Sequence, residues 1–268
     1  MQRKNVKMVL VLSLVLTLVF GMATAFASPG NFLIDDPYQL ESVMLEGNRV
    51  RTNYDFLLQA GMPQEEIATL DSITKEFIVN NLREAGVTPF ELEYIDLEVV
   101  PTIVQRVNQL LTGVTYTVFA FRSGNTVFIY PTYEFTTARR PRGQDSFAVS
   151  LGDALQPFNY GGQLWARDPL ISPVWDPQWS LHANTQSFSG AAFSGSQLGT
   201  PSWPVQFRGN TFIHANIGSG SDRRIIMTYM YNPNRNNFSI SFSAFGLGVS
   251  FNSSGNIWTS ASTQVLNF

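Results

Sequence analysis

The sequence predicts an α+β protein: a short helical N-terminal segment followed by a mainly antiparallel β-sandwich or barrel. Apolar residues follow a helical spacing between residues 53 and 85 and an alternating, strand-like spacing from residue 91 onward. Short apolar runs in the second part are separated by Gly, Asn and Pro, which is typical of sandwiches and barrels. With 44% hydrophobic and 14% charged residues in 268, the chain has enough apolar material for a sizeable core and is not intrinsically disordered.

The N-terminus has the pattern of a secretory signal peptide. Three basic residues among the first seven precede an apolar stretch, Met8–Met22, and the small-residue motif Ala25-Phe26-Ala27 follows it. The apolar stretch is about 15 residues long, whereas a membrane span needs roughly 20. We therefore expect residues 1–27 to be removed after Ala27. The mature chain has no later apolar stretch of spanning length, so we expect a secreted, extracellular protein without a transmembrane span.

The charge distribution and the lack of cysteine limit the classes of function that the chain can have. Residues 28–100 hold 14 acidic against four basic side chains, and residues 101–268 hold six acidic against ten arginines. Such a split indicates either docking between the two parts or simply a more acidic helical segment. The chain has no cysteine, which excludes thiol nucleophiles and cysteine-held metal sites. An exported protein without disulfides is stabilised by packing alone, which favours a Gram-positive-type secreted protein.

The acidic segment, residues 28–90, is predicted to contain two helices. The first covers about residues 53–60 and ends at Gly61, and the second covers residues 63–85 and ends at Gly86. Pro63 suits the first turn of the second helix, and acidic residues follow it there. The two helices are expected to pack their apolar stripes together or onto the rest of the protein.

The stretch LLQAGMPQEEIATL, residues 57–70, superficially has the pattern of a DNA-binding helix-turn-helix. Export and the acidic surroundings exclude nucleic acid as a partner, because phosphate binding needs a basic face. The helix pair around residues 53–85 resembles one found in uncharacterised secreted proteins of Gram-positive bacilli. The resemblance implies an extracellular location and carries no active residue or function to this chain.

Residues 91–268 are predicted to form a β-rich domain. Strand alternation begins at residues 91–98 with a slip near Ile95, and a hairpin with a Gly124-Asn125 turn follows. A shift of the apolar phase predicts a β-bulge or tight turn near Ala244–Phe245. Residues 139–177 contain five prolines and no steady period, and we expect long loops there. Further strands are expected near residues 146–151, 179–183, 205–207, 211–217, 224–231, 238–244, 247–251 and 257–266.

The two histidines of the chain occur in similar settings, Leu181-His182-Ala183-Asn184 and Ile213-His214-Ala215-Asn216. If the two segments pair in a sheet, they form either a two-histidine site or a general base beside amide groups. The alternative is two unrelated strands with structural polar residues. Asp176 and Asp222 are the nearest acids in sequence and complete the weak set of catalytic candidates. Neither has a recognised metal-ligand spacing, so we expect no metal and no cofactor.

The distribution of aromatic and basic residues favours a binding function over a catalytic one. All five tryptophans lie in the β-rich part, three of them between residues 165 and 179. Tryptophan rings on loops over a rigid sheet stack on sugar faces or contact a protein, or else pack the loops onto the sheet. The densest basic cluster is Arg139-Arg140-Pro141-Arg142. The candidate ligand-binding residues are Trp165, Trp175, Trp179, Arg139, Arg140 and Arg142.

These observations favour a secreted β-rich binding protein that acts on an extracellular glycan, a cell-wall polymer or a protein surface. The sequence contains no nucleophile elbow and no obvious pair of catalytic carboxylates. It therefore favours a binding protein over an enzyme, and an enzymatic function stays an open alternative. One alternative is a secreted hydrolase whose acidic N-terminal segment is a pro-region. Another is a membrane-active protein, suggested by the alternation of serine and aromatic residues in residues 238–251.

Overall fold

The computed structural model describes residues 43–45, 48–50, 52–101, 109–138, 144–181, 183–187, 189–196, 205–232, 238–242, 249–253 and 258–268. All of them belong to one compact unit, Ser42–Phe268. Most of these residues form antiparallel strands, as the alternation predicts. None of the helices in this part of the chain is long and apolar enough to cross a membrane.

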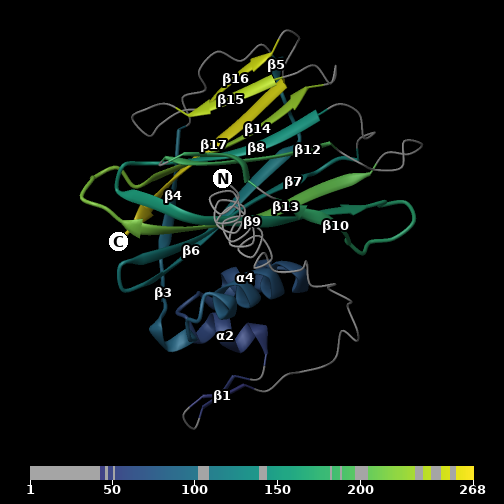
Figure 1. Cartoon of the computed structure of the whole chain (residues 1–268). Helices are drawn as coiled ribbons and strands as arrows, with labels where there is room; N and C mark the ends of the chain where they lie inside the picture. Colours follow the sequence, from purple (N-terminus) through teal and green to yellow (C-terminus); the bar gives the residue numbers. More distant parts are fainter. Residues whose placement is uncertain are drawn as a thin grey trace, which may run out of the picture. The chain divides into compact units, whose positions relative to one another are not determined.

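Two large sheets account for most of the strands (Figure 1). The six-stranded sheet has the order β10 (Asp176–Leu181), β9 (Leu155–Arg167), β13 (Gln206–Ile217), β7 (Thr126–Phe135), β6 (Val114–Ser123) and β3 (Glu93–Tyr94). The seven-stranded sheet has the order β11 (Ala183–Ser187), β12 (Gly190–Ser196), β8 (Gln144–Leu151), β14 (Arg224–Asn232), β17 (Trp258–Asn267) and β4 (Asp96–Val100), and β5 (Gln109–Leu110) also pairs with β17. Two short pairs, β1 (Val43–Leu45) with β2 (Asn48–Val50) and β15 (Phe238–Phe242) with β16 (Val249–Ser253), complete the strands.

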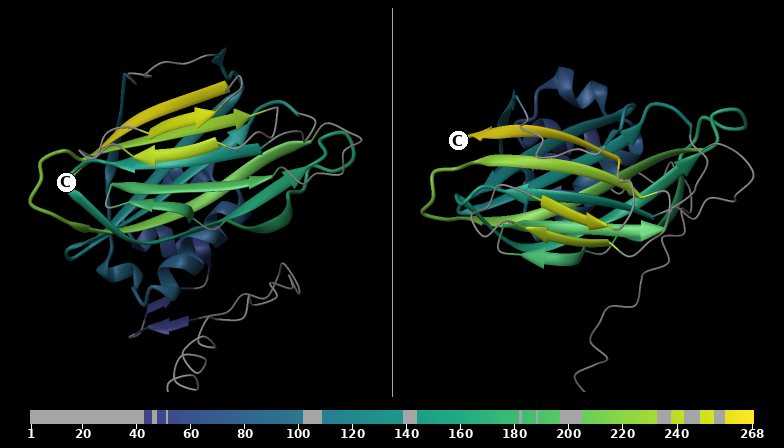
Figure 2. Two further views of the ribbon diagram at one scale, coloured as in Figure 1. Left: turned by 45° about the horizontal axis from the view of Figure 1, so that its top comes forward. Right: turned by 90° about the horizontal axis from the view of Figure 1, so that it is seen from above.

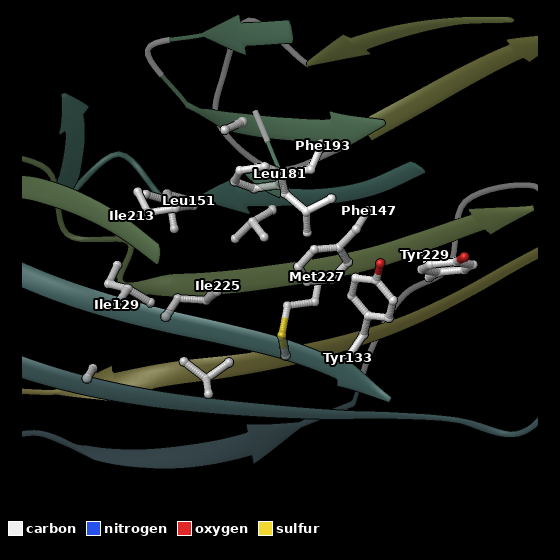
Figure 3. Close-up of a cluster of buried hydrophobic side chains, with 14 of the residues drawn as sticks. Ile129, Tyr133, Phe147, Leu151, Leu181, Phe193, Ile213, Ile225, Met227 and Tyr229 are labelled. Carbon is white, nitrogen blue, oxygen red and sulfur yellow. The ribbon is translucent and has the colours of Figure 1, made fainter. Parts of the chain in front are cut away.

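The two sheets face each other across the main core, which is the sandwich arrangement. Ile129 and Tyr133 of β7 point into this core, where Tyr133 packs with Phe147 of β8 and Tyr229 of β14 (Figure 3). The ring centroid of Tyr133 lies 4.8 Å from those of both Phe147 and Tyr229. Aromatic side chains from both sheets therefore interdigitate, and this packing stabilises a chain that has no disulfide.

The chain passes from one sheet to the other at Ile95, where the sequence shows a slip in its alternation. Tyr94 on β3 pairs with Phe121 in the six-stranded sheet, and Asp96 on β4 pairs with Asn267 in the seven-stranded sheet. Ile95 itself is buried in the core between the sheets. The slip thus marks a change of sheet, because alternation within one strand does not continue across such a corner.

In the described part of the chain, three helices precede the two large sheets: α2 (Asn53–Gln59), α3 (Gln64–Thr69) and α4 (Ser72–Glu84), followed by the short 3₁₀ turn η1 (Pro89–Glu91). The helix expected over residues 63–85 is in fact two helices. Asp71 adopts an extended conformation between them, and its Oδ1 accepts a hydrogen bond from the Thr74 backbone N–H at 2.8 Å. The preference of Asp for the N-cap position starts a new helix there, although the apolar spacing continues through it.

The helices pack against the six-stranded sheet on its face away from the main core (Figure 2). Phe128 and Tyr130 of β7 alternate with Ile129 and lie in a second core with Ile78 and Leu82 of α4. Strands β6 and β7 are therefore covered on both faces. This explains their uninterrupted apolar runs, which are more typical of fully buried strands than of a half-exposed sandwich strand.

The prediction of long loops over residues 139–177 is wrong for most of that segment, which contains β8 and β9. Strand β9 escapes recognition because Pro157 and a Gly-Gly pair interrupt its alternation. A Cβ atom on Gly161 would lie 2.5 Å from Cε1 of Phe212, and one on Gly162 would lie 2.6 Å from the backbone oxygen of Asn210. Close approach of β13 thus requires glycine inside this strand. The predicted bulge near Ala244–Phe245 lies outside the described residues.

Candidate functional site

The connection between β9 and β10 exposes a cluster of aliphatic side chains. Leu170, Ile171 and Val174 are 89%, 76% and 60% exposed. In the described part of the chain, no other five-residue stretch contains three large exposed hydrophobic side chains. Single exposed apolar residues are normal in soluble proteins, whereas a cluster at the end of a hairpin marks a contact surface.

Hydrogen bonds within the loop hold its backbone. The N–H of Leu170 donates to Oδ1 of Asp168 at 2.9 Å, and the N–H groups of Ile171 and Ser172 donate to the Asp168 backbone oxygen at 3.1 and 2.9 Å. The Val174 N–H donates to Oγ of Ser172 at 3.1 Å. Pro169 and Pro173 have no N–H. Every backbone donor from residue 169 to 174 is therefore either absent or bonded within the loop.

Trp175 anchors the loop to the sheet. Its side chain is only 5% exposed, and the guanidinium carbons of Arg167 and Arg208 lie 4.3 and 4.4 Å from its ring centroid. The Arg167 side chain also donates to the backbone oxygen of Pro173 at 3.4 Å. Because both cations cover this ring, Trp175 fixes the base of the loop and does not present a free stacking surface.

An ionic network surrounds Trp175. The buried Arg208 pairs with Oε2 of Glu134 at 2.8 Å and with Oδ2 of Asp71, while Arg167 lies 3.7 Å from Oε1 of Glu134. Burial alone raises the pKa of Asp71, but hydrogen bonds from Arg208 and from Thr74, together with the Arg208 charge, lower it below the usual value. The network thus connects the loop to the N-terminus of α4.

Trp165, on β9 directly opposite Arg208, is half-buried. Its Nε1 has no hydrogen-bond partner in the described part of the chain. The same holds for the side-chain amide of Asn210, which lies two residues after Arg208 on β13 and is fully buried. Trp179 lies on β10, where its backbone pairs with Leu164. The side chain of Trp179 and all of Arg139, Arg140 and Arg142 lie outside what the structure describes.

His214 occupies the other end of β13 and also contacts the helical layer. Its Nε2 lies 2.8 Å from Oδ1 of Asn81 on α4, and its Nδ1 lies 3.3 Å from Nδ2 of Asn159 on β9. The hydroxyl of Tyr130 donates to the same Asn81 oxygen at 3.0 Å. An amide oxygen on Nε2 and an amide nitrogen on Nδ1 fit a neutral imidazole with its proton on Nε2.

The surroundings of His214 are apolar. The rings of Phe128, Phe212 and Phe158 have centroids 4.8, 5.0 and 6.1 Å from the imidazole centroid. Burial lowers the pKa of His214 from 6.5 to about 4, because a charged imidazole loses its hydration there. Both ring nitrogens are engaged and the ring is neutral near pH 7, which favours a structural role over general-base chemistry.

The other catalytic candidates do not gather around His214. Asp222 forms a two-pronged ion pair with Arg224, at 2.9 Å for both contacts, and Asp176 is exposed at the start of β10. The hypothesis that the two histidine segments pair in the sheet is not supported, because β9 lies between β10 and β13. His182 lies outside the described residues. Among those residues, no three His, Asp or Glu side chains are grouped as metal ligands.

Sequence reasoning missed the residues that make up the loop site: Arg167, Leu170, Ile171, Val174 and Arg208. A signal for the loop was present, since Leu170 and Ile171 stand between two prolines in a segment that otherwise reads as polar turns. Proline flanks and adjacent aliphatic residues together indicate an exposed apolar loop end. For Arg208 no local signal exists, because its partners come from three distant parts of the chain.

No protein-family model and no curated protein matches the chain. Among solved structures, a pore-forming protein is similar over 64% of this chain and 90% of its own, with 7% identity and a TM-score of 0.36. The collagen-binding subdomain of the Enterococcus faecalis surface protein ACE is similar over 55% and 90%, with 9% identity and a TM-score of 0.30. The KRT10-binding region domain of the pneumococcal serine-rich repeat protein PsrP is similar over 61% and 98%, with 12% identity and a TM-score of 0.27. At such TM-scores these similarities support no conclusion about function.

Proposed function

We propose that this chain is an exported β-rich interaction protein that binds its target through the apolar end of the β9–β10 loop. The predicted signal peptide supports an extracellular location. The observation that carries the proposal is the exposure of Leu170, Ile171 and Val174 on a loop whose base is fixed by Trp175. A fixed loop loses little conformational entropy on binding, so its apolar surface contributes efficiently.

The size of the surface sets the expected affinity. Burying one exposed aliphatic side chain is worth about 1.5–3 kcal/mol. Three partly exposed side chains give roughly 5 kcal/mol, which corresponds to a dissociation constant on the order of 0.1–1 mM. A single loop end is therefore a weak, reversible contact. Tight retention needs further contacts or several copies on one surface.

The structure favours an apolar target over a glycan. Sugar faces are bound by free aromatic rings, whereas the Trp175 ring is covered by Arg167 and Arg208 and the loop end is aliphatic. The glycan and wall-polymer alternatives now depend on the half-buried Trp165, on Trp179 and on the arginines of residues 139–142. The packing of Phe128 and Tyr130 beneath the helices weighs against a removable pro-region, because removal would expose them.

Co-sedimentation tests the proposal. The chain from Ser28 to Phe268, which contains the whole compact unit, is incubated with insoluble glycans, purified cell wall and vesicles, and the pelleted fraction is measured. We expect retention on one material and at least a tenfold loss in Leu170→Asp/Ile171→Asp. The matched control is Val99→Asp, because Val99 is 71% exposed on the distant strand β4. Equal retention of all three proteins would show that the loop is not the binding element.

A further inference from the structure

We propose that the target of the β9–β10 loop is the hydrocarbon boundary of a lipid bilayer, into which Leu170, Ile171 and Val174 insert. This inference rests on the proposed function and names the partner of the same site. Leu170 and Ile171 are adjacent at the end of the hairpin and are the two most exposed of the three. In Figure 1 the connection between β9 and β10 extends to the right of the β10 label.

The backbone N–H groups of the loop are already paired, which favours entry into a medium without water. Inside a bilayer, each unpaired N–H or C=O costs several kcal/mol, and this excludes most irregular loops from the hydrocarbon region. Here the N–H groups of Leu170, Ile171, Ser172 and Val174 are all bonded within the loop, and residues 169 and 173 are prolines. No backbone donor of the loop end must lose a water partner when the end enters the lipid.

The side chains also favour lipid over a protein partner. Protein interfaces concentrate their binding energy in Trp, Tyr and Arg, and Leu and Val are under-represented there. The loop reverses that distribution: its Trp175 and Arg167 are engaged at the base, and only aliphatic side chains are exposed at the end. A branched aliphatic surface without orienting polar groups fits a fluid hydrocarbon, which requires no specific hydrogen bonds.

Charge indicates what kind of bilayer is bound. Residues 168–175 contain no Lys or Arg, and the nearest cation in the sequence, Arg167, lies 3.7 Å from Glu134. Asp168 accepts hydrogen bonds from the loop backbone. The loop therefore gains nothing from anionic headgroups, and binding is driven by apolar transfer alone. We expect it to be insensitive to salt and equal on zwitterionic and anionic vesicles.

Vesicle flotation is the first experiment. The Ser28–Phe268 protein is mixed with vesicles of phosphatidylcholine alone, or of phosphatidylcholine with phosphatidylglycerol, at low and high salt. We expect flotation on both, unchanged by salt, retained in Val99→Asp and reduced at least tenfold in Leu170→Asp/Ile171→Asp. Thermal unfolding of the variants checks that they are folded.

Insertion itself is tested by an environment-sensitive fluorophore. Because the chain has no cysteine, Ile171→Cys offers a single labelling position, and Val99→Cys is the matched control. We expect a blue shift and increased emission on phosphatidylcholine vesicles for the label at residue 171 and no change for the label at residue 99.

Four outcomes separate this inference from the proposed function. The protein could be retained by cell wall, a glycan or an extracellular protein through the loop and yet fail to float with vesicles. That result would overturn the bilayer as the target and leave the proposed function standing. Flotation only on anionic vesicles and only at low salt overturns apolar insertion. Flotation unaffected by the loop substitutions overturns both, as does a wild-type protein that stays unbound with every material.

Discussion

The two ends of strand β13 attach the helical layer to the sheet by opposite chemistry. At one end Arg208 is surrounded by charge, pairing with Asp71 and Glu134. Six residues further along the strand, His214 is surrounded by amides and phenyl rings and is neutral. A buried charge requires permanent partners, whereas a buried neutral base requires only that the pH stays above its pKa. The ionic end is therefore vulnerable to mutation and the neutral end to acid.

Removal of Arg208 is expected to have the largest effect. Arg208→Ala leaves Glu134 without its closest partner and opens one side of Trp175, so we expect a loss of about 3–5 kcal/mol in the free energy of unfolding. Urea denaturation measures it. The matched control is Arg224→Ala, because the Arg224 side chain is 44% exposed in its ion pair with Asp222, whereas that of Arg208 is 10% exposed; its loss should cost less than about 1 kcal/mol. Equal losses in the two variants would contradict the distinction.

Trp175→Ala should be the next most damaging. The ring is 5% exposed beneath two guanidinium groups, and deletion of a buried aromatic side chain costs about 3 kcal/mol. The same urea experiment measures the loss, and vesicle flotation measures binding. Undiminished stability with lost binding would instead mean that this ring contacts the ligand, as the sequence suggests.

Acid should act on the His214 end. The pKa of His214 is about 4 in the folded protein and near 6.5 in the unfolded chain. The unfolded chain therefore binds a proton first as the pH falls. The contribution of the neutral His214 to the free energy of unfolding is fully present above about pH 7 and is lost progressively between pH 6.5 and pH 4. It totals about 3 kcal/mol.

Unfolding free energies measured across this pH range test the acid effect. In His214→Gln the slope between pH 6.5 and pH 4 should be smaller than in the wild type. An unchanged slope would assign the acid sensitivity to other groups.

Asn81→Ala should be the mildest of these changes. It removes the acceptor shared by His214 and Tyr130 and leaves two buried donors unpaired, at about 1–3 kcal/mol. Its combination with His214→Gln should cost less than the sum of the single changes, because both remove the same contact. Strict additivity in the double mutant would show that the Asn81 contact is not energetically important.

The sequence predicts local features of this fold better than distant ones. The hairpin around Gly124-Asn125 is found as expected, with Gly124 at a φ of +57°, because alternation and turn chemistry are both local. The break at Asp71 and the strand through Gly161 and Gly162 were missed. The N-cap at Asp71 is a local signal that the continuous apolar spacing obscures, whereas the glycines of β9 are required by a tertiary contact with Phe212.

The candidate site was predictable only in part. Tryptophans near the β9–β10 connection indicated that region, but the sequence could not show which aromatic side chains would be covered. Trp175 is buried because Arg167 and Arg208 reach it from β9 and β13, and no local pattern records that meeting. The 89% exposure of Leu170 is likewise a property of the folded loop that no local pattern specifies.

The corner at Ile95 has a consequence for how the protein reaches its final state. Strand β4, which follows Ile95, pairs with β17, the last strand of the chain. Closing this ladder brings together segments at opposite ends of the domain, and such distant pairing slows folding. The seven-stranded sheet therefore cannot be completed before β17 has been synthesised, however early the helices and the first hairpin form.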